Sequence, residues 1–296
     1  MFRTSRDRQR NYGVILLAYH LLNSDYIPPV TLGTILFQII VFLGFIPALD
    51  HFKIPAMCLL PSRIISQHEW LRLFASLIMH ADDMHLYYNM ISFLWKGRRL
   101  ETRFGSRRFF ILLMTFCIST SICMVALSYL VEVVFGFRSL QLMKQCAVGF
   151  SGVIFALKVL HNNYFPDSDS VIFGWFPVSS RYGCWVELFL IQMVTPNASF
   201  IGHLAGIIVG LLYLNGPLKL LTDFIDTTAL LLFGQRNGSH YNGYRNSGSS
   251  TTHGRQNFFE YTGGMTEEEQ LRYAREESLR GNRYPSAPPY PDSFMS

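Results

Sequence analysis

The stretch Gly202-His203-Leu204-Ala205-Gly206-Ile207-Ile208-Val209-Gly210 is apolar apart from a single imidazole. Its three glycines recur at every fourth residue, so they lie on one face of a helix. Such a ridge of small residues allows two membrane helices to pack backbone to backbone. An ionisable side chain at membrane depth is costly, and by default it marks a functional site. The stretch therefore predicts a closely packed membrane helix that carries a functional histidine, His203.

A serine lies in similar surroundings, in the sequence Gly149-Phe150-Ser151-Gly152. Ten residues separate Ser151 from the polar His161, which corresponds to about 15 Å of helix. Twelve separate His203 from Asn215, or about 18 Å. Both groups therefore lie roughly midway across a hydrocarbon core of about 30 Å, where they can form a nucleophile with its base. The alternatives are a serine that caps a helix and a histidine with a structural role.

His85 and Asn89 are the polar candidates of a third segment. Their spacing of four places both on one helix face, and the eleven residues from His85 to Lys96 correspond to about 16 Å. Both side chains can donate hydrogen bonds, and donors around a developing oxyanion are commonly the largest single contribution to peptide hydrolysis. The pair is predicted to hold an oxyanion. The alternative is a polar contact that ties two helices together.

The composition places these segments in a membrane protein. Of the 296 residues, 50% are hydrophobic and only 15% are charged, against about 25% charged in typical soluble domains. We expect an all-α, polytopic bundle of six transmembrane helices within residues 28–216. The expected spans are residues 30–47, 85–96, 109–133, 147–160, 183–195 and 200–216. Residues 1–27 are expected to form a cytosolic or interfacial segment, and residues 217–234 an interfacial helix.

Lysine and arginine set the predicted orientation. Four arginines precede the first span, and six cations crowd residues 96–108 between the second and third spans. Cytosolic loops carry such an excess, so both termini are predicted to be cytosolic. The formal net charge of +5 then reflects cations beside the membrane and does not indicate nucleic-acid binding. Lys158 is expected to snorkel to the cytosolic interface. Glu187, inside the fifth span, is either a substrate gate or a structural carboxyl.

The five cysteines show neither a CxxC motif nor a Cys/His spacing typical of a metal site. No metal and no cofactor are therefore expected. Cys58 and Cys146 both fall in connections that are expected on the outer side of the membrane. Their spacing leaves a disulfide open but does not favour one.

Three motifs together resemble the rhomboid family of intramembrane serine proteases. They are Gly149-x-Ser151-Gly152, His203 followed by the glycine ridge, and His85-x-x-x-Asn89. The connection Leu100-Glu101-x-x-x-Gly105 is similar to the family pattern as well. The resemblance covers about residues 28–216. It implies a Ser-His dyad without an acid, with Ser151 as nucleophile and His203 as general base. It also implies an oxyanion site formed by His85, Asn89 and the backbone N–H of Ser151.

The resemblance implies further pocket residues. His80 and Gly149 are expected near the oxyanion site, and Arg72 in the loop between the first two spans. Many rhomboids stack a tyrosine on the catalytic histidine. Phe155 takes that place here, one helical turn beyond the serine, and lacks the hydroxyl.

The C-terminal tail divides into three predicted parts. Residues 235–264 read as a flexible linker, and residues 282–296 as a disordered, Pro-rich end. Residues 265–281 resemble a ubiquitin-interacting motif, in which Leu271, Ala274 and Ser278 share one helix face. Ubiquitin or ubiquitinated proteins are the predicted partners of this helix. The alternative is a solvated, charged helix.

The function predicted from these features is that of an intramembrane serine endopeptidase. It would cut single-span membrane proteins in or near their transmembrane segments and take ubiquitinated or unstable clients in quality control and degradation. Short spans suit the thin bilayer of the endoplasmic reticulum, which is the predicted location. The alternative is a non-catalytic rhomboid-like protein that binds clients and assists their extraction from the membrane.

Overall fold

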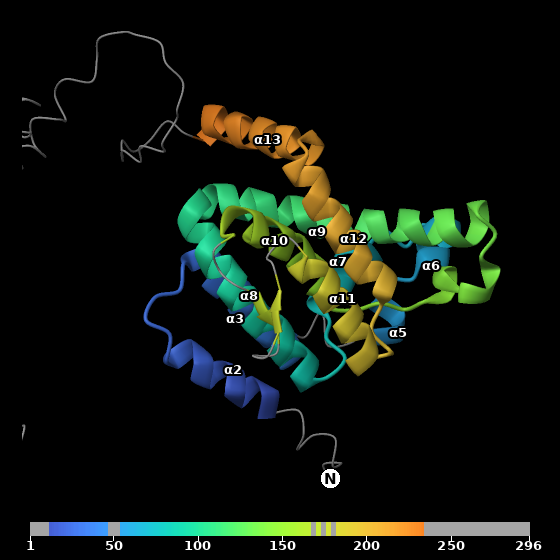
Figure 1. The fold of residues 1–296 in the computed structure, drawn as a ribbon, viewed down its shortest axis with the longest axis horizontal. Coiled ribbons are helices and arrows are strands. Elements are labelled where there is room, and N and C mark those ends of the chain that lie inside the picture. Colours follow the sequence, from blue (N-terminus) through green and yellow to red (C-terminus); the bar gives the residue numbers. More distant parts are fainter. Residues whose placement is uncertain (1–11, 47–53, 167–169, 173–175, 179–181, 234–296) are drawn as a thin grey trace, which may run out of the picture. The chain divides into compact units, whose positions relative to one another are not determined.

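The computed structural model describes residues 12–46, 54–166, 170–172, 176–178 and 182–233. The helices are α2 (Tyr12–Leu22), α3 (Pro29–Phe42), α5 (Ile54–Met57), α6 (Pro61–Gln67), α7 (Arg72–Ile78), α8 (Asp83–Phe104), α9 (Ser106–Tyr129), α10 (Ser151–Tyr164), α11 (Gly183–Val194), α12 (Phe200–Leu214) and α13 (Pro217–Phe233). A π-helical turn, Leu130–Val134, extends α9, and two 3-10 turns follow at Arg138–Leu140 and Leu142–Lys144. Figure 1 shows this arrangement.

One hairpin adds strands to the predicted all-α fold. Strands β1 (Ser170–Ile172) and β2 (Phe176–Val178) pair antiparallel, with Ser170 opposite Val178. Both runs contain β-branched or aromatic residues, and the connection between them contains Gly174. These features favour a short hairpin. The all-α class is confirmed, and this short hairpin between α10 and α11 is an addition to it.

The buried core lies among α8, α9, α10 and α12. Large aromatic side chains fill it, and Phe93, Phe109 and Phe116 are inaccessible to solvent. The ring of Phe93 meets the ring of Phe150, which precedes α10, edge to face at 5.4 Å between centroids. Tyr213 of α12 packs in the same way against Phe116 of α9. These contacts fix α10 and α12 against the long helices α8 and α9.

The predicted glycine ridge is confirmed as the contact between α10 and α12, which run side by side in Figure 1. A Cβ atom at Gly206 would lie 2.0 Å from the carbonyl oxygen of Gly152. One at Gly210 would lie 2.7 Å from Cβ of Val159. The two helices therefore meet at backbone distance, and only glycine permits this at position 206.

The boundaries of several predicted spans differ from the helices. α8 continues to Phe104, beyond the predicted end at residue 96, because lysine and arginine are good helix formers and their heads reach water. α10 begins at Ser151, later than the predicted residue 147. Ala147 instead pairs with Leu59 in an isolated β-bridge, and Gly149 has a φ of 108°, which a helix does not allow.

By length and composition, one helix in the described part of the chain can cross a membrane, namely Ser106–Val134. α12 and α13 would make a second if the pair, bent by 69°, is counted as one span. α2, α3 and α11 are apolar but shorter. The total of six spans stays a prediction.

Helix α2 packs along α8, which the prediction of a cytosolic or interfacial segment 1–27 did not anticipate. The backbone N–H of Gly13 donates to Asp83 at 2.8 Å, and His20 contacts the hydroxyl of Tyr87 at 3.2 Å. The start of α2 thus lies at the end of α8 that carries His85. The side of the membrane on which the N-terminus lies stays a prediction.

Helix α13 follows α12 after the bend and is tied to the start of α9. Arg107 pairs with Asp226 at 3.3 Å, and Arg108 pairs with Asp223. Apolar side chains on the rest of the helix, among them Phe224, remain exposed. The predicted helix at residues 217–234 is therefore present, and its interfacial position stays a prediction.

Glu101 connects two helices through the backbone. Its carboxylate lies near the end of α8, is 1% exposed, and accepts the N–H groups of Val30 and Thr31 at 2.9 and 2.7 Å. It also accepts the hydroxyl of Thr31 at 2.7 Å. A carboxylate at a helix N-terminus satisfies donors that would otherwise be unpaired and complements the helix dipole. This contact explains the Leu100-Glu101 feature in physical terms.

We expect Glu101→Gln to lower the free energy of unfolding by about 2 kcal/mol, because the amide presents N–H hydrogens to donors. Thermal unfolding of the purified protein in detergent measures the change. Thr102→Ala is the control, since Thr102 is exposed and its hydroxyl donates to the carbonyl oxygen of Arg98 in its own helix. Equal stability of Glu101→Gln and wild type would contradict the capping role.

Candidate active site

Ser151 and His203 lie in hydrogen-bond contact. The distance from Nε2 of His203 to Oγ of Ser151 is 2.9 Å. Ser151 is the first residue of α10, and His203 lies in the first turn of α12, where Ser199 caps the helix by accepting the N–H of Gly202 at 3.1 Å. The contact that the matched depths and the glycine ridge predicted is therefore present.

The imidazole of His203 is held by packing. Its ring stacks on the ring of Phe155 with centroids 4.7 Å apart and an angle of 29° between the planes, and the residue is 5% exposed. Within the described residues, Nδ1 of His203 has no hydrogen-bond partner. No carboxylate in that part of the chain contacts the ring, as the resemblance to an acid-free Ser-His pair implies.

Gly149 allows His85 to approach the chain just before Ser151. A Cβ atom at Gly149 would lie 2.7 Å from Cε1 and 2.8 Å from Nε2 of His85, and 3.7 Å from Nδ2 of Asn89. The N–H of Gly149 donates to the carbonyl oxygen of Ser76 at 2.9 Å, which fixes this backbone. The predicted pocket residue Gly149 and the predicted oxyanion residues His85 and Asn89 are therefore neighbours.

The hydrogen bonds around His85 determine its tautomer. Nδ1 accepts the backbone N–H of Ala81 at 3.3 Å, so the proton of the neutral ring belongs on Nε2. Asp82 caps α8 by accepting the backbone N–H of His85 at 2.7 Å. Asn89 uses one hydrogen of its amide on the carbonyl oxygen of His85, at 2.9 Å. Both side chains thus keep a donor hydrogen beside Gly149.

His80 lies where the sequence predicted, next to the oxyanion candidates. Its ring meets the ring of His85 edge to face at 5.2 Å. The side chain is 5% exposed, and neither ring nitrogen has a hydrogen-bond partner in the described part of the chain. His80 therefore supports His85 by packing.

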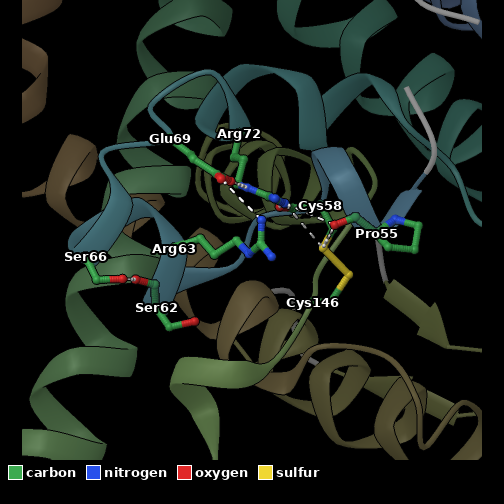
Figure 2. A network of polar contacts seen from close by, with 8 residues as sticks. All are labelled: Pro55, Cys58, Ser62, Arg63, Ser66, Glu69, Arg72 and Cys146. Carbon is green, nitrogen blue, oxygen red and sulfur yellow. Dashed lines mark hydrogen bonds and ion pairs between the residues drawn. A yellow bond between two sulfur atoms is a disulfide. The ribbon is translucent and has the colours of Figure 1, made fainter. Parts of the chain in front are cut away.

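Arg72 organises the loop between α3 and α8, as Figure 2 shows. The residue is 3% exposed, and its Nη1 donates to the carbonyl oxygens of Cys58 and Pro55 at 2.9 and 3.3 Å. Nε pairs with Glu69. This hydrogen bond holds the pKa of the Glu69 carboxyl below its usual range, so the pair stays charged at neutral pH.

A disulfide joins Cys58 to Cys146, a bond that the sequence spacing did not favour (Figure 2). The two residues are 88 positions apart, so the distance along the chain gave no sign of their proximity. Leu59 and Ala147 pair directly beside them. Because Cys146 lies five residues before Ser151, the bond ties the Arg72 loop to the chain that enters the site.

We expect Cys58→Ser together with Cys146→Ser to lower the free energy of unfolding by about 3 kcal/mol, because the bond closes a long loop. Thermal unfolding with and without a reductant measures this change. The reductant should destabilise the wild type to the level of the double variant and leave the double variant unchanged. A wild type that is insensitive to reduction would contradict the prediction.

The expectation that Lys158 snorkels to the cytosolic interface was wrong. The residue is 8% exposed and forms an ion pair with Glu187, which joins α10 to α11. It does not snorkel away from the bundle, because a carboxylate on the neighbouring helix neutralises it in place. Of the two roles predicted for Glu187, the pairing supports the structural one.

The predictions of a ubiquitin-binding helix and of the absence of a metal both stay predictions. Leu271, Ala274 and Ser278 lie outside the described residues, as does the whole C-terminal tail. Among the described residues, no group of three histidine, cysteine or acidic side chains could hold a metal ion.

Comparison with known proteins shows which family the chain belongs to. The rhomboid domain family matches residues 67–217. Rhomboid-related protein 4 of Homo sapiens is 41% identical over 302 residues, which cover 96% of this chain and 93% of that protein. The chain belongs to the rhomboid family. Rhomboid-related protein 4 of Mus musculus is 40% identical over 307 residues, covering 96% of this chain and 93% of that protein.

A plant rhomboid is similar over a shorter region. Rhomboid-like protein 14, mitochondrial, of Arabidopsis thaliana is 39% identical over 190 residues, which cover 63% of this chain and 55% of that protein. Rhomboids are embedded in membranes, and α9 with its extension supplies an apolar span here.

Proposed function

We propose that this rhomboid is an active intramembrane serine endopeptidase that works through a Ser-His dyad. The contact of 2.9 Å between His203 and Ser151 is the observation that carries the proposal. Ser151 Oγ attacks the carbonyl carbon of the peptide bond, and Nε2 of His203 accepts its proton. The same histidine then protonates the leaving amine, and water hydrolyses the acyl-enzyme with His203 again as the base.

The oxyanion of each tetrahedral intermediate would be held by three donors. These are Nε2–H of His85, the free amide hydrogen of Asn89 and the backbone N–H of Ser151. As the first residue of α10, Ser151 has a backbone N–H without a partner inside the helix and lies at the positive end of the helix dipole. Donors arranged in this way before the reaction lower the barrier because they need no reorganisation as charge develops.

The substrates would be single-span membrane proteins, cut in or near their transmembrane segments. The proposed location is the endoplasmic reticulum, with the C-terminal tail in the cytosol. There the motif-like segment with Leu271, Ala274 and Ser278 would bind ubiquitin and recruit marked or unstable clients for degradation. Loss of ubiquitin binding in Ala274→Gly with Ser278→Ala tests this part, and unchanged binding would remove it.

Labelling with a fluorophosphonate tests the nucleophile without knowledge of a substrate. The full-length wild type should be labelled, Ser151→Ala should not, and His203→Ala should be labelled far more slowly. Ser128→Ala is the matched control, because this buried hydroxyl of α9 donates to the carbonyl oxygen of Met124 in its own helix. Absence of labelling in the wild type would favour the non-catalytic, client-binding alternative.

A further inference from the structure

Basic side chains gather at the end of α8 opposite His85. Lys96, Arg99 and Arg103 are spaced by three and four residues, so they share one face of the helix. Nη1 of Arg99 lies 3.5 Å from Nε2 of His161 on α10. Lys96 is close enough to His161 and to Lys158 to interact with both electrostatically. These five residues, Lys96, Arg99, Arg103, Lys158 and His161, form what we call the inner basic cluster.

Counted over the described residues, the cluster has more positive than negative charge. In the described part of the chain its single acidic partner is Glu187, and that carboxylate is engaged by Lys158. Lys96 donates instead to the hydroxyl of Ser92 at 2.6 Å. Arg103 lies over the ring of Tyr164, with 4.8 Å between the guanidinium carbon and the ring centroid. Three cations are therefore held in place without a carboxylate among the described residues.

The neighbouring arginines show that this imbalance is local. Arg107 and Arg108, only a few residues further along the chain, are both neutralised by aspartates of α13. Arg99, in contrast, is exposed, and its guanidinium group contacts the imidazole of His161 and the ring of Phe165 at the end of α10. Among the described residues, aspartates of α13 thus neutralise Arg107 and Arg108, whereas Lys96, Arg99 and Arg103 have no carboxylate partner and are available to an anion.

The depth of the cluster suits the headgroup layer of a membrane. Eleven residues separate His85 from Lys96 and eighteen separate it from Arg103, which correspond to about 16 and about 27 Å along α8. A site midway across a core of about 30 Å places these residues at and beyond the edge of the hydrocarbon. Lipid phosphates lie at that level, and the local excess of lysine and arginine indicates the cytosolic leaflet.

We propose that the inner basic cluster binds a phosphate group, carried by an anionic phospholipid of the cytosolic leaflet. Arginine forks match phosphate oxygens in pairs, and lysine adds a point charge. Basic pockets between transmembrane helices on this side commonly receive such headgroups. A bound phosphate would join the inner ends of α8 and α10, the two helices that carry His85 and Ser151 at their other ends. The proposal does not depend on proteolysis.

The test uses the full-length protein in nanodiscs of phosphatidylcholine, with or without phosphatidylinositol monophosphate. Native mass spectrometry counts the bound lipid, and thermal unfolding measures the stabilisation. We expect the phosphorylated lipid to bind the wild type and raise its melting temperature. Arg99→Gln and Lys96→Gln should each weaken the affinity about fivefold, since a cation near an anionic lipid contributes about 1 kcal/mol.

Arg98→Gln is the matched control. It removes the same charge one residue away, on a different face of α8. Its lipid affinity should equal that of the wild type. Melting of each variant in phosphatidylcholine alone separates lost binding from lost stability.

Three outcomes would overturn the proposal. One is a wild type that binds the phosphorylated lipid no better than phosphatidylcholine. Another is an equal loss of affinity in Arg98→Gln, which would mean that general surface charge attracts the lipid. The third is full stabilisation by inorganic phosphate in phosphatidylcholine nanodiscs, which would assign the site to a soluble phosphate and not to a lipid.

Discussion

Ser151→Ala and His203→Ala should each lower the rate of substrate cleavage by at least about four orders of magnitude, because nucleophile and base act as one unit. The same coupling predicts that the double variant is no slower than either single variant. The hydrogen bond of 2.9 Å between the two side chains is the structural basis for this non-additivity. Cleavage of a destabilised single-span protein, reconstituted with each purified variant, measures the rates.

The cleavage rates of further variants test whether an acidic residue acts together with Ser151 and His203. Nδ1 of His203 has no hydrogen-bond partner among the described residues. Replacing an acidic side chain of the described helices should therefore not reproduce the loss of cleavage seen in Ser151→Ala or His203→Ala. Glu187→Gln is a suitable comparison, since this carboxylate lies in the bundle but pairs with Lys158. Cleavage that persists in Ser151→Ala would exclude the proposed mechanism.

The position of the site could be predicted because the rise of a helix is fixed. Counting residues from a polar membrane edge converts directly into depth, and the counts from Ser151, His203 and His85 agree. The count from His85 used Lys96 as its end point although α8 runs on to Phe104. His85 does lie beside Gly149, close to Ser151, and the depth of these groups in the membrane stays a prediction. The glycine ridge then identified which helices touch.

Contacts between distant segments could not be predicted in this way. Lys158 and Glu187 form an ion pair because α10 and α11 are neighbours. The local sequence of neither helix indicates which helix packs against it. The same holds for Cys58 and Cys146, whose proximity depends on the loop that Arg72 holds together. Residues in the short helices α5, α6 and α7 carry no long periodic pattern, so this loop was anticipated only by its arginine.

Gly206→Ala should reduce cleavage about 100-fold or more, although the substitution adds one methyl group and touches no reacting atom. The new Cβ would lie 2.0 Å from the carbonyl oxygen of Gly152, so α10 and α12 must separate by about 1 Å. Ser151 and His203 lie on these two helices, and a misplacement of this size costs about two orders of magnitude in a catalytic pair. Fluorophosphonate labelling and substrate cleavage should fall together.

Two further glycines distinguish this steric effect from a general loss of stability. Gly210→Ala meets Cβ of Val159 at 2.7 Å and should reduce activity less than Gly206→Ala, because the overlap is smaller and lies farther from the dyad. Gly33→Ala on α3 meets nothing within 4 Å, so it should keep full activity and gain up to about 1 kcal/mol of stability from its better helix propensity. If activity is highest in Gly33→Ala, lower in Gly210→Ala and lowest in Gly206→Ala, catalysis depends on the distance between α10 and α12. Equal activity of all three would separate catalysis from that distance.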